Sequence, residues 1–258
     1  MKICLLGSGS RGNSIYVEYR GTAILIDQGF PHKTIEERLS SRGLDSGKIK
    51  ALFISHEHSD HIKGAGVTAR KLDIPVYGTP KTLEAKRSRI FPGEETLVSV
   101  ESGEEITIGQ IRVQPYSVSH DGADPVQYCV TAGARKMAVA TDLGFASTLV
   151  IERLKDADIV VVESNHDVEM LKKGPYPWQL KQRIMSRTGH LSNRNAAELI
   201  FNLAQNRSQK AILAHLSEEN NTPDLAVREI RELFARFDHR LYDLIVADQD
   251  EATDIIEP

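Results

Sequence analysis

One stretch of the chain, from Ser55 to His61, has the sequence Ser-His-Glu-His-Ser-Asp-His. The four residues before it, Ala-Leu-Phe-Ile at 51–54, predict a short buried strand. A strand that ends in such a loop brings several imidazole nitrogens and carboxylate oxygens into one small space. These groups are the usual ligands of zinc, and they also suit manganese and iron. One tetrahedral ion with an open position needs fewer donors than this loop supplies, so the spacing predicts two metal ions.

Length and composition are those of an ordinary globular chain. The 258 residues, 40% hydrophobic and 26% charged, fit one large α/β domain or two small ones. A net charge of -4 gives no general attraction to nucleic acid, although a nuclease needs only a local basic rim. The apolar runs are too short for a membrane span or a signal peptide. Cys4 and Cys129 lie in strand-like runs and are expected to be buried thiols. We therefore expect a cytoplasmic protein with no membrane partner.

The first 27 residues predict a β-meander. Residues 7–12 match Gly-x-Gly-x-x-Gly, but in a dinucleotide-binding protein that loop must open a helix. Here residues 14–19 alternate and predict a strand, a hairpin turn follows at Arg20 and Gly21, and residues 22–27 predict the next strand. The loop is then either a tight turn or a set of backbone N–H groups near a phosphate.

Beyond the meander, most predicted strands are followed by predicted helices, which indicates two sheets with helices around them in two similar halves. The expected strands cover 51–54, 74–77, 106–108, 111–118, 126–131, 136–140, 157–162, 210–214 and 241–246. The expected helices cover 33–41, 64–71, 81–89, 147–155, 178–187, a segment ending near 205, and 223–236. The helix over 81–89 is basic, and it is either a phosphate-facing rim or a solvated surface.

Several other polar residues follow strands. Asp27 ends the third strand, and His120 stands at a strand end before a glycine loop. Asp142, Glu163 and His215 each follow a later apolar strand. Taken singly, such residues are common turn or surface groups. Together they place further ligand-type side chains where strands end.

The order His-x-His-x-Asp-His after an apolar strand resembles the signature of the metallo-β-lactamase superfamily. The resemblance implies an α/β fold over residues 1–258: an αββα sandwich with two mixed sheets flanked by helices, in a single domain. It also implies two divalent ions, zinc or manganese, and Asp27 as a carboxylate that supports their ligands. The ligands that it implies are His56, His58 and His120 for one ion, Asp60, His61 and His215 for the other, and Asp142 as the bridge.

Two further stretches resemble motifs of the tRNase Z phosphodiesterases, namely Glu163-Ser-Asn and Gly189-His-Leu-Ser-Asn193. In that group an acid and a histidine form a pair, and the histidine protonates the leaving oxygen. The resemblance therefore implies Asp60, Glu163 and His190 as the catalytic residues. The long tRNA-gripping arm of tRNase Z is not evident. Residues 143–214 are too few to include a β-CASP insertion.

Across nearly its whole length the chain resembles the YycJ/WalJ branch of the superfamily. Motifs that carry this resemblance are Gly7-Ser-Gly-Ser-x-Gly-Asn-Ser14, Ser119-His-Asp121, Thr141-Asp-Leu-Gly144, Glu163-Ser-Asn-His166 and Leu213-Ala-His-Leu-Ser-Glu-Glu-Asn-Asn-Thr-Pro223. The branch implies a metal-dependent phosphodiesterase that acts as a 5′-to-3′ DNA exonuclease. In such an enzyme we expect phosphate contacts from Ser217, Asn13 and Arg194, the last at a helix start, where anions are favoured.

Other functions stay open at this point. A small-molecule phosphodiesterase, acting on cyclic nucleotides or cyclic phosphates, is favoured by the missing arm and the net negative charge, and opposed by the basic segment 81–89. A non-catalytic metal sensor would not need a leaving-group acid. Thioester or lactone hydrolysis needs such an acid less than phosphodiester cleavage does.

Overall fold

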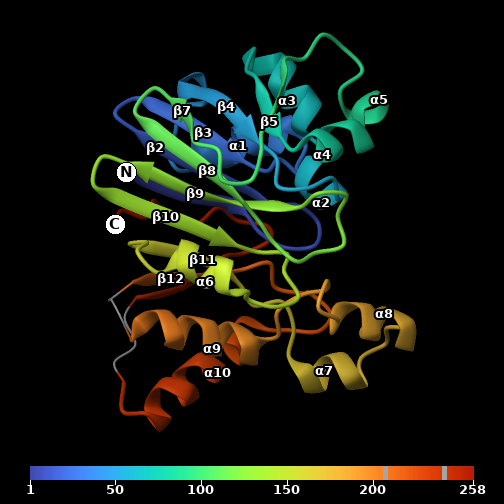
Figure 1. Cartoon of the computed structure of the whole chain (residues 1–258), viewed down its shortest axis with the longest axis vertical. Helices are drawn as coiled ribbons and strands as arrows, with labels where there is room; N and C mark the ends of the chain where they lie inside the picture. The colour runs from blue at the N-terminus through green and yellow to red at the C-terminus, as the bar shows by residue number, and fades with distance from the viewer. Residues whose placement is uncertain (206–208, 240–242) are drawn as a thin grey trace. The chain divides into compact units, whose positions relative to one another are not determined.

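The computed structural model describes residues 1–205, 209–239 and 243–258, whose strands form two sheets flanked by helices (Figure 1). The chain divides into two compact units. Unit 1 comprises Met1–Ser117, Gly122–Arg135 and Ala247–Pro258, and unit 2 comprises Val118–Asp121 and Lys136–Val246. Among the described residues, no helix combines the length and the apolar character that crossing a membrane requires.

The six-stranded sheet of unit 1 has its strands in chain order. They are β1 (Lys2–Gly7), β2 (Ser14–Tyr19), β3 (Thr22–Ile26), β4 (Ile49–Phe53), β5 (Val76–Gly78) and β6 (Leu97–Ser99). The first three pair antiparallel and the rest add in parallel. Arg20 and Gly21, at the tip of the β2–β3 hairpin, both have positive φ, which matches the twist of the strands. The predicted meander is therefore present, and the loop before β2 opens no helix.

The helices of unit 1 carry the chain between these strands. They are α1 (His32–Ser41), the short 3₁₀ helix η1 (Ser46–Lys48), α2 (Ser59–Ile62), α3 (Ala65–Leu72), α4 (Pro80–Ala85) and α5 (Arg87–Ile90). Ile35 and Leu39 of α1 join the core beneath the sheet. The single basic helix predicted over 81–89 is wrong, because the helix breaks at Lys86. Leu83 of α4 is buried whereas no residue of α5 is, so no continuous apolar stripe holds both segments in one helix.

Three antiparallel strands complete the description of unit 1: β7 (Ile106–Ile108), β8 (Ile111–Ser117) and β9 (Val126–Ala132). The start of β9 is tied to the loop that follows β4. The Tyr128 hydroxyl donates to the Ile54 carbonyl at 2.7 Å, and the Val126 N–H donates to the Ser55 carbonyl at 3.0 Å. These bonds fix the residue from which the His-x-His-x-Asp-His loop departs.

Unit 2 is built on parallel strands, β10 (Arg135–Ala140), β11 (Ile159–Glu163), β12 (Lys210–Ala214) and β13 (Leu244–Val246). Its helices are α6 (Thr148–Leu154), α7 (Val168–Lys173), α8 (Trp178–Ile184), α9 (Asn193–Ala204) and α10 (Pro223–Arg236). Helix α9 packs against β11, α6 and α10 (Figure 1). Parallel pairing places the carboxyl ends of β10, β11 and β12 at one edge of the sheet, the usual location of a site in an open α/β sheet. A last strand was predicted over 241–246, and its residues 241 and 242 lie outside the described residues.

Glu18 forms a buried polar contact in unit 1. Its carboxylate accepts hydrogen bonds from the Lys48 ammonium and the Tyr16 hydroxyl, each at 2.8 Å, and the residue is 7% exposed. Burial acts to raise the pKa of Glu18, but the hydrogen bonds from Lys48 and Tyr16 outweigh it and lower this pKa below its ordinary value. A depressed carboxyl pKa stabilises the fold above the unfolded-state pKa, and this stability is lost as pH falls through the folded-state value.

We expect Glu18→Gln to lower the free energy of unfolding by about 1–3 kcal/mol at neutral pH, because a charged acceptor is lost. The difference from the wild type should shrink as pH falls through the depressed pKa of Glu18. Urea unfolding across the acid range measures both. The exposed Glu37 serves as a control, since Glu37→Gln removes only a surface ion pair. A deficit of constant size at every pH would show that the carboxylate charge is not the cause.

Candidate active site

In unit 1, the ligand-type side chains of the loop after β4 form two pairs. Nε2 of His56 lies 3.0 Å from Nδ1 of His58, and Nε2 of His61 lies 3.2 Å from Oδ2 of Asp60. Two donors that each lie about 2.0–2.1 Å from one tetrahedral zinc ion are roughly 3.3 Å apart. Each pair therefore has the spacing of two neighbouring ligands of a divalent ion, and the donor atoms fit that use.

Asp27 stands behind this loop at the end of β3, with a positive φ of 59° and its side chain buried. Its Oδ2 lies 2.8 Å from Nδ1 of His61 and accepts the Ser55 hydroxyl at 2.8 Å, while Oδ1 accepts the Ser55 N–H at 2.8 Å. A carboxylate on Nδ1 fixes the ring so that Nε2 faces Asp60, and it makes the imidazole a stronger ligand. Ser55 was not predicted from the sequence, yet its hydroxyl also lies 2.9 Å from Nδ1 of His56.

Asn13 is buried, and its side chain is engaged within unit 1. Its Oδ1 accepts the Gly9 N–H at 2.9 Å, and its Nδ2 lies 3.3 Å from Oδ2 of Asp60. The backbone N–H of Asn13 also donates to the Asp60 carbonyl at 2.7 Å. Gly29 faces the same carbonyl so closely that a Cβ there would lie 1.8 Å from it. These contacts hold Asp60 in place, and the substrate contact predicted for Asn13 stays a prediction.

In unit 2, four side chains gather where the parallel strands end. Asp142, Glu163, His190 and His215 offer ligand atoms that all lie within 4.8 Å of one another. Asp142 and His215 both have φ of 55°, a left-handed conformation that is uncommon for such residues and recurs at functional sites. Nε2 of His215 lies 3.5 Å from Oδ1 of Asp142. The cluster is mostly buried, and its imidazole and carboxylate donors suit a divalent ion.

Glu163 connects two histidines through one oxygen. Oε1 lies 2.7 Å from Nδ1 of His190 and 2.9 Å from Nδ1 of His215, while Oε2 accepts the Leu191 N–H at 3.0 Å and the Leu143 N–H at 3.3 Å. The carboxylate has no exposed surface. Burial acts to raise the pKa of Glu163, but the charge of His190 and the bonds from both imidazoles outweigh burial and lower it to about 2. The sequence predicted Glu163 as a partner of His190 alone, and the contact with His215 was missed.

His190 has the complementary shift. Burial acts to lower its pKa, whereas the charge of Glu163 and the hydrogen bond to it raise the pKa above the ordinary value. The side chain is 22% exposed, so solvent or a ligand reaches the ring. When Nδ1–H donates to Glu163, Nε2 is the ring nitrogen left to act on a bound molecule.

His120 belongs to the same unit. Its Nδ1 lies 3.1 Å from the Gly189 carbonyl, and its ring centroid lies 5.1 Å from that of His190. A donated Nδ1–H leaves Nε2 as the ligating nitrogen. Gly189 fits only without a side chain, because a Cβ would lie 2.2 Å from the Ile184 carbonyl.

A buried amide network holds the loop after β12. Nδ2 of Asn165 donates to the His215 carbonyl at 3.0 Å, and the Ser217 N–H donates to the Asn165 carbonyl at 2.8 Å. The side chains of Asn193 and Asn221 exchange hydrogen bonds at 2.8 Å. None of these three asparagines was predicted as a site residue. The signal that could have found them is their position in or beside the histidine motifs of the sequence. Ser217 is itself buried, and its hydroxyl accepts the N–H of Asn220 at 3.2 Å.

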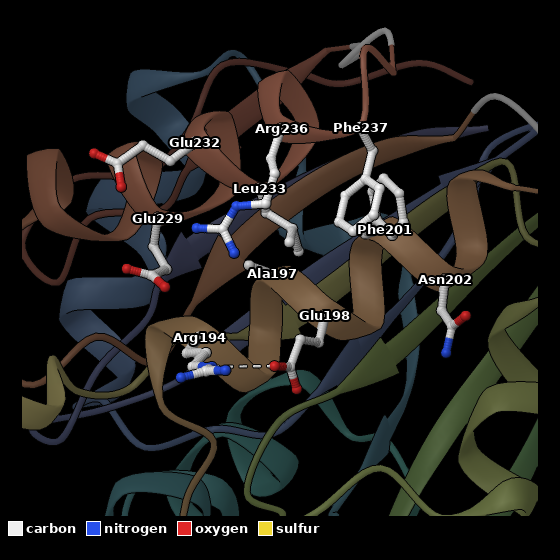
Figure 2. A pocket seen from close by; sticks show the side chains of 10 residues that line it. All are labelled: Arg194, Ala197, Glu198, Phe201, Asn202, Glu229, Glu232, Leu233, Arg236 and Phe237. Carbon is white, nitrogen blue, oxygen red and sulfur yellow. Dashed lines mark hydrogen bonds and ion pairs between the residues drawn. The ribbon is translucent and has the colours of Figure 1, made fainter.

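His166, the last residue of the motif Glu163-Ser-Asn-His166, is buried at 2% exposure. Burial lowers its pKa to about 4, so the ring is neutral near pH 7. Arg194, by contrast, is exposed on α9 and donates from Nε to Glu198 at 3.2 Å. Figure 2 shows this pair on the wall of a cavity of about 410 Å³ between α9 and α10. A phosphate contact from Arg194 stays a prediction.

A family model described as a beta-lactamase superfamily domain matches residues 22–216. The chain belongs to this superfamily. It is 39% identical over 231 residues to the Bacillus anthracis protein named exodeoxyribonuclease YycJ, an overlap of 89% of this chain and 87% of that one. It is also 39% identical over 228 residues to exodeoxyribonuclease WalJ of Streptococcus pneumoniae strain D39, covering 87% and 85% of the two chains.

Among solved structures, the metallo-beta-lactamase fold protein YhfI from Bacillus subtilis matches with a TM-score of 0.74 at 16% identity, covering 98% of this chain and 99% of that one. The predicted superfamily, the likeness to YycJ and WalJ, and the fold class of two mixed sheets flanked by helices are confirmed. The His and Asp clusters described above are able to hold divalent metal.

Asp27→Asn tests how the loop after β4 is organised. Asparagine tolerates the left-handed backbone at this position, but it loses the charged acceptor of His61. We expect metal affinity to fall about 10- to 100-fold, the usual effect of losing such a partner, with the fold retained. Calorimetric titration with zinc and manganese measures the change. Asp73→Asn is the matched control, because Asp73 also has a positive φ, of 51°, and is exposed. Equal affinities of the two variants would contradict the assigned role.

Proposed function

We propose that the chain is a metal-dependent phosphodiesterase that removes nucleotides from DNA ends in the 5′-to-3′ direction. The observation that carries the reaction class is the hydrogen-bonded pair of buried Glu163 and partly exposed His190 beside Asp142 and His215. The DNA substrate is supported by two relatives, each named exodeoxyribonuclease and each matching more than four fifths of both chains.

The proposed metal ligands are those implied by the superfamily. They are His56, His58 and His120 for one ion, Asp60, His61 and His215 for the other, and Asp142 as the bridge. Neutral imidazole and carboxylate suit both zinc and manganese. Two such ions, when bound, supply a hydroxide near neutral pH and neutralise charge on the phosphate. Asp27 and Glu163 would keep His61 and His215 in their ligating orientation.

His190 is the proposed proton donor to the leaving oxygen. A 3′ or 5′ alkoxide is a poor leaving group, so phosphodiester cleavage gains from a proton delivered as the bond breaks. Glu163 remains ionised and holds Nδ1, and the transferred proton would come from Nε2. The raised pKa of His190 favours the protonated ring that this role requires.

Ser217, Asn13 and Arg194 are the proposed phosphate contacts. Asn13 also lies against Asp60, with its Nδ2 3.3 Å from Oδ2 of Asp60. A cytoplasmic location is proposed because Cys4 and Cys129 are both buried thiols, as is common in reducing compartments.

The first test is cleavage with known metal content. Protein loaded with manganese or zinc is given 5′- and 3′-labelled single- and double-stranded DNA, RNA, and bis-p-nitrophenyl phosphate. We expect stepwise release of nucleotides from the 5′ end of DNA, and complete loss of activity in Asp142→Ala because the bridging carboxylate is gone. Turnover of the small diester with all polynucleotides intact would replace the nuclease with a small-molecule phosphodiesterase.

The second test separates proton donation from metal binding. We expect His190→Ala to keep its metal content and to lose about 10²- to 10⁴-fold in kcat on DNA. The loss on bis-p-nitrophenyl phosphate should be under about tenfold, since nitrophenolate leaves without a proton. Stopped assays and elemental analysis measure these quantities.

Two further variants serve as comparisons for His190→Ala. Glu163→Ala should lose both metal and turnover, because Glu163 also orients His215. His239→Ala should change neither, since His239 packs on Phe201 and Phe234 at the end of α10. Equal losses of His190→Ala on DNA and on the activated diester would remove the proton-donor role.

A further inference from the structure

Unit 2 contains a second cavity, distinct from the one in Figure 2, between the loop that follows β10 and helix α9. Its volume is about 250 Å³. The lining is apolar from Phe145, Ile151, Leu191 and Leu199, with amide groups from Asn195 and Asn202. The carboxylate of Glu198, which is paired with Arg194, also lines the cavity. This volume is below the roughly 300–1,000 Å³ of a drug-sized site.

Two residues of the cavity lining are close in sequence to residues of the candidate site. Phe145 follows Asp142 by three positions, and Leu191 is the neighbour of His190. The N–H of Leu191 donates to Oε2 of Glu163 at 3.0 Å, which ties this wall to the proton-donor pair. The wall formed by Leu191 is therefore joined to Glu163 by a hydrogen bond.

Phe145 is held rigidly on its loop. The guanidinium carbon of Arg187 lies 3.9 Å from the centroid of the Phe145 ring and covers one face of it. Gly144 packs on the backbone of Arg187 so closely that a Cβ would lie 2.3 Å from its carbonyl carbon. The Ser119 hydroxyl donates to the Arg187 carbonyl at 2.8 Å, and the Gly144 N–H donates to the Ser119 carbonyl at 3.0 Å.

We propose that this cavity is a nucleobase subsite, in which the base of a nucleotide next to the scissile phosphate stacks on Phe145. This inference rests on the proposed nuclease function. Stacking on an aromatic ring accepts any base, as a nuclease that acts on any sequence requires, because every base has a π-face. Arg187 adds positive charge at the ring, where a phosphate of the same strand is attracted.

The two amides complete the subsite. Oδ1 of Asn195 accepts the Ser192 hydroxyl at 2.7 Å, so the amide group is held in a fixed orientation. Asn202 lies two turns further along α9 and lines the same cavity. Amide groups both donate and accept hydrogen bonds, so they are able to bond the edges of different bases. The ligand class is therefore a nucleotide in which the base contributes to affinity.

The decisive experiment compares binding of dAMP with binding of 2-deoxyribose 5-phosphate, which has a hydroxyl group in place of the base. By calorimetry the wild type should bind dAMP about 10- to 100-fold more tightly than the sugar phosphate, as expected for one stacked base. Phe145→Ala should remove this preference. Phe145→Leu keeps most of the apolar volume but has no flat ring, so it should also remove the preference. It provides the test if Phe145→Ala fails to fold.

Phe237→Ala is the matched control. Phe237 is an exposed phenylalanine of the same unit that lines the other cavity (Figure 2), and its loss should leave the preference unchanged. Equal binding of dAMP and 2-deoxyribose 5-phosphate by the wild type would overturn the subsite. So would a preference that survives in Phe145→Leu.

A parallel assay uses DNA with abasic residues at the first two positions of the 5′ end. The loss of cleavage caused by the abasic residues and the loss caused by Phe145→Ala should not add, because each change removes the same contact. The two proposals fail separately. If the wild type cleaves no DNA, the nuclease proposal falls, and the dAMP preference still decides the subsite. If DNA is cleaved while Phe145→Ala behaves as Phe237→Ala with both ligands, the subsite falls and the nuclease stands.

Discussion

A single carboxylate, Glu163, organises the strand ends of unit 2. A buried charge is costly unless it is paired and fully hydrogen-bonded, and Glu163 meets this condition with two imidazoles and two backbone N–H groups. The backbone donors come from Leu143 and Leu191, each of which directly follows a site residue. One ion-pair network therefore fixes the loop after β10 and the segment before α9 together. It also joins the proposed proton donor and a proposed metal ligand through one oxygen atom.

Unit 1 has a similar arrangement at the end of β3. Asp27 accepts from both donors of Ser55 and lies against Nδ1 of His61, so a buried carboxylate again sets the orientation of an imidazole. In both units the oxygen faces Nδ1, and Nε2 is the nitrogen left for chemistry. In each unit a glycine also packs closely against the backbone of another residue. Gly29 faces the Asp60 carbonyl, and Gly144 faces the backbone of Arg187, at distances that no side chain permits.

Most of the fold could be predicted because it rests on local patterns. Alternation over 14–19 and the turn at Arg20 and Gly21 predicted the meander, and the strands and most helices lie close to their expected positions. The elements that were not predicted have weak local signals in the sequence. Strand β6 has only three residues, none of them fully buried, and α7 has six residues with one buried. The basic segment 81–89 had good helix formers but no continuous apolar stripe, and it is broken at Lys86.

The sequence by itself determined the kinds of ligand and their places at strand ends, because residue identity and strand periodicity are local properties. Only the tertiary structure decided which atoms meet. Asp27, Asp142 and His215 have backbone φ angles in the left-handed region. Packing imposes this conformation, and the residue pattern does not predict it. The second contact of Glu163, the engagement of Asn13 with Asp60, and the stack of Arg187 on Phe145 each join residues more than 40 positions apart. Such pairs form because folding brings strand ends together, and the spacing of residues along the chain does not encode them.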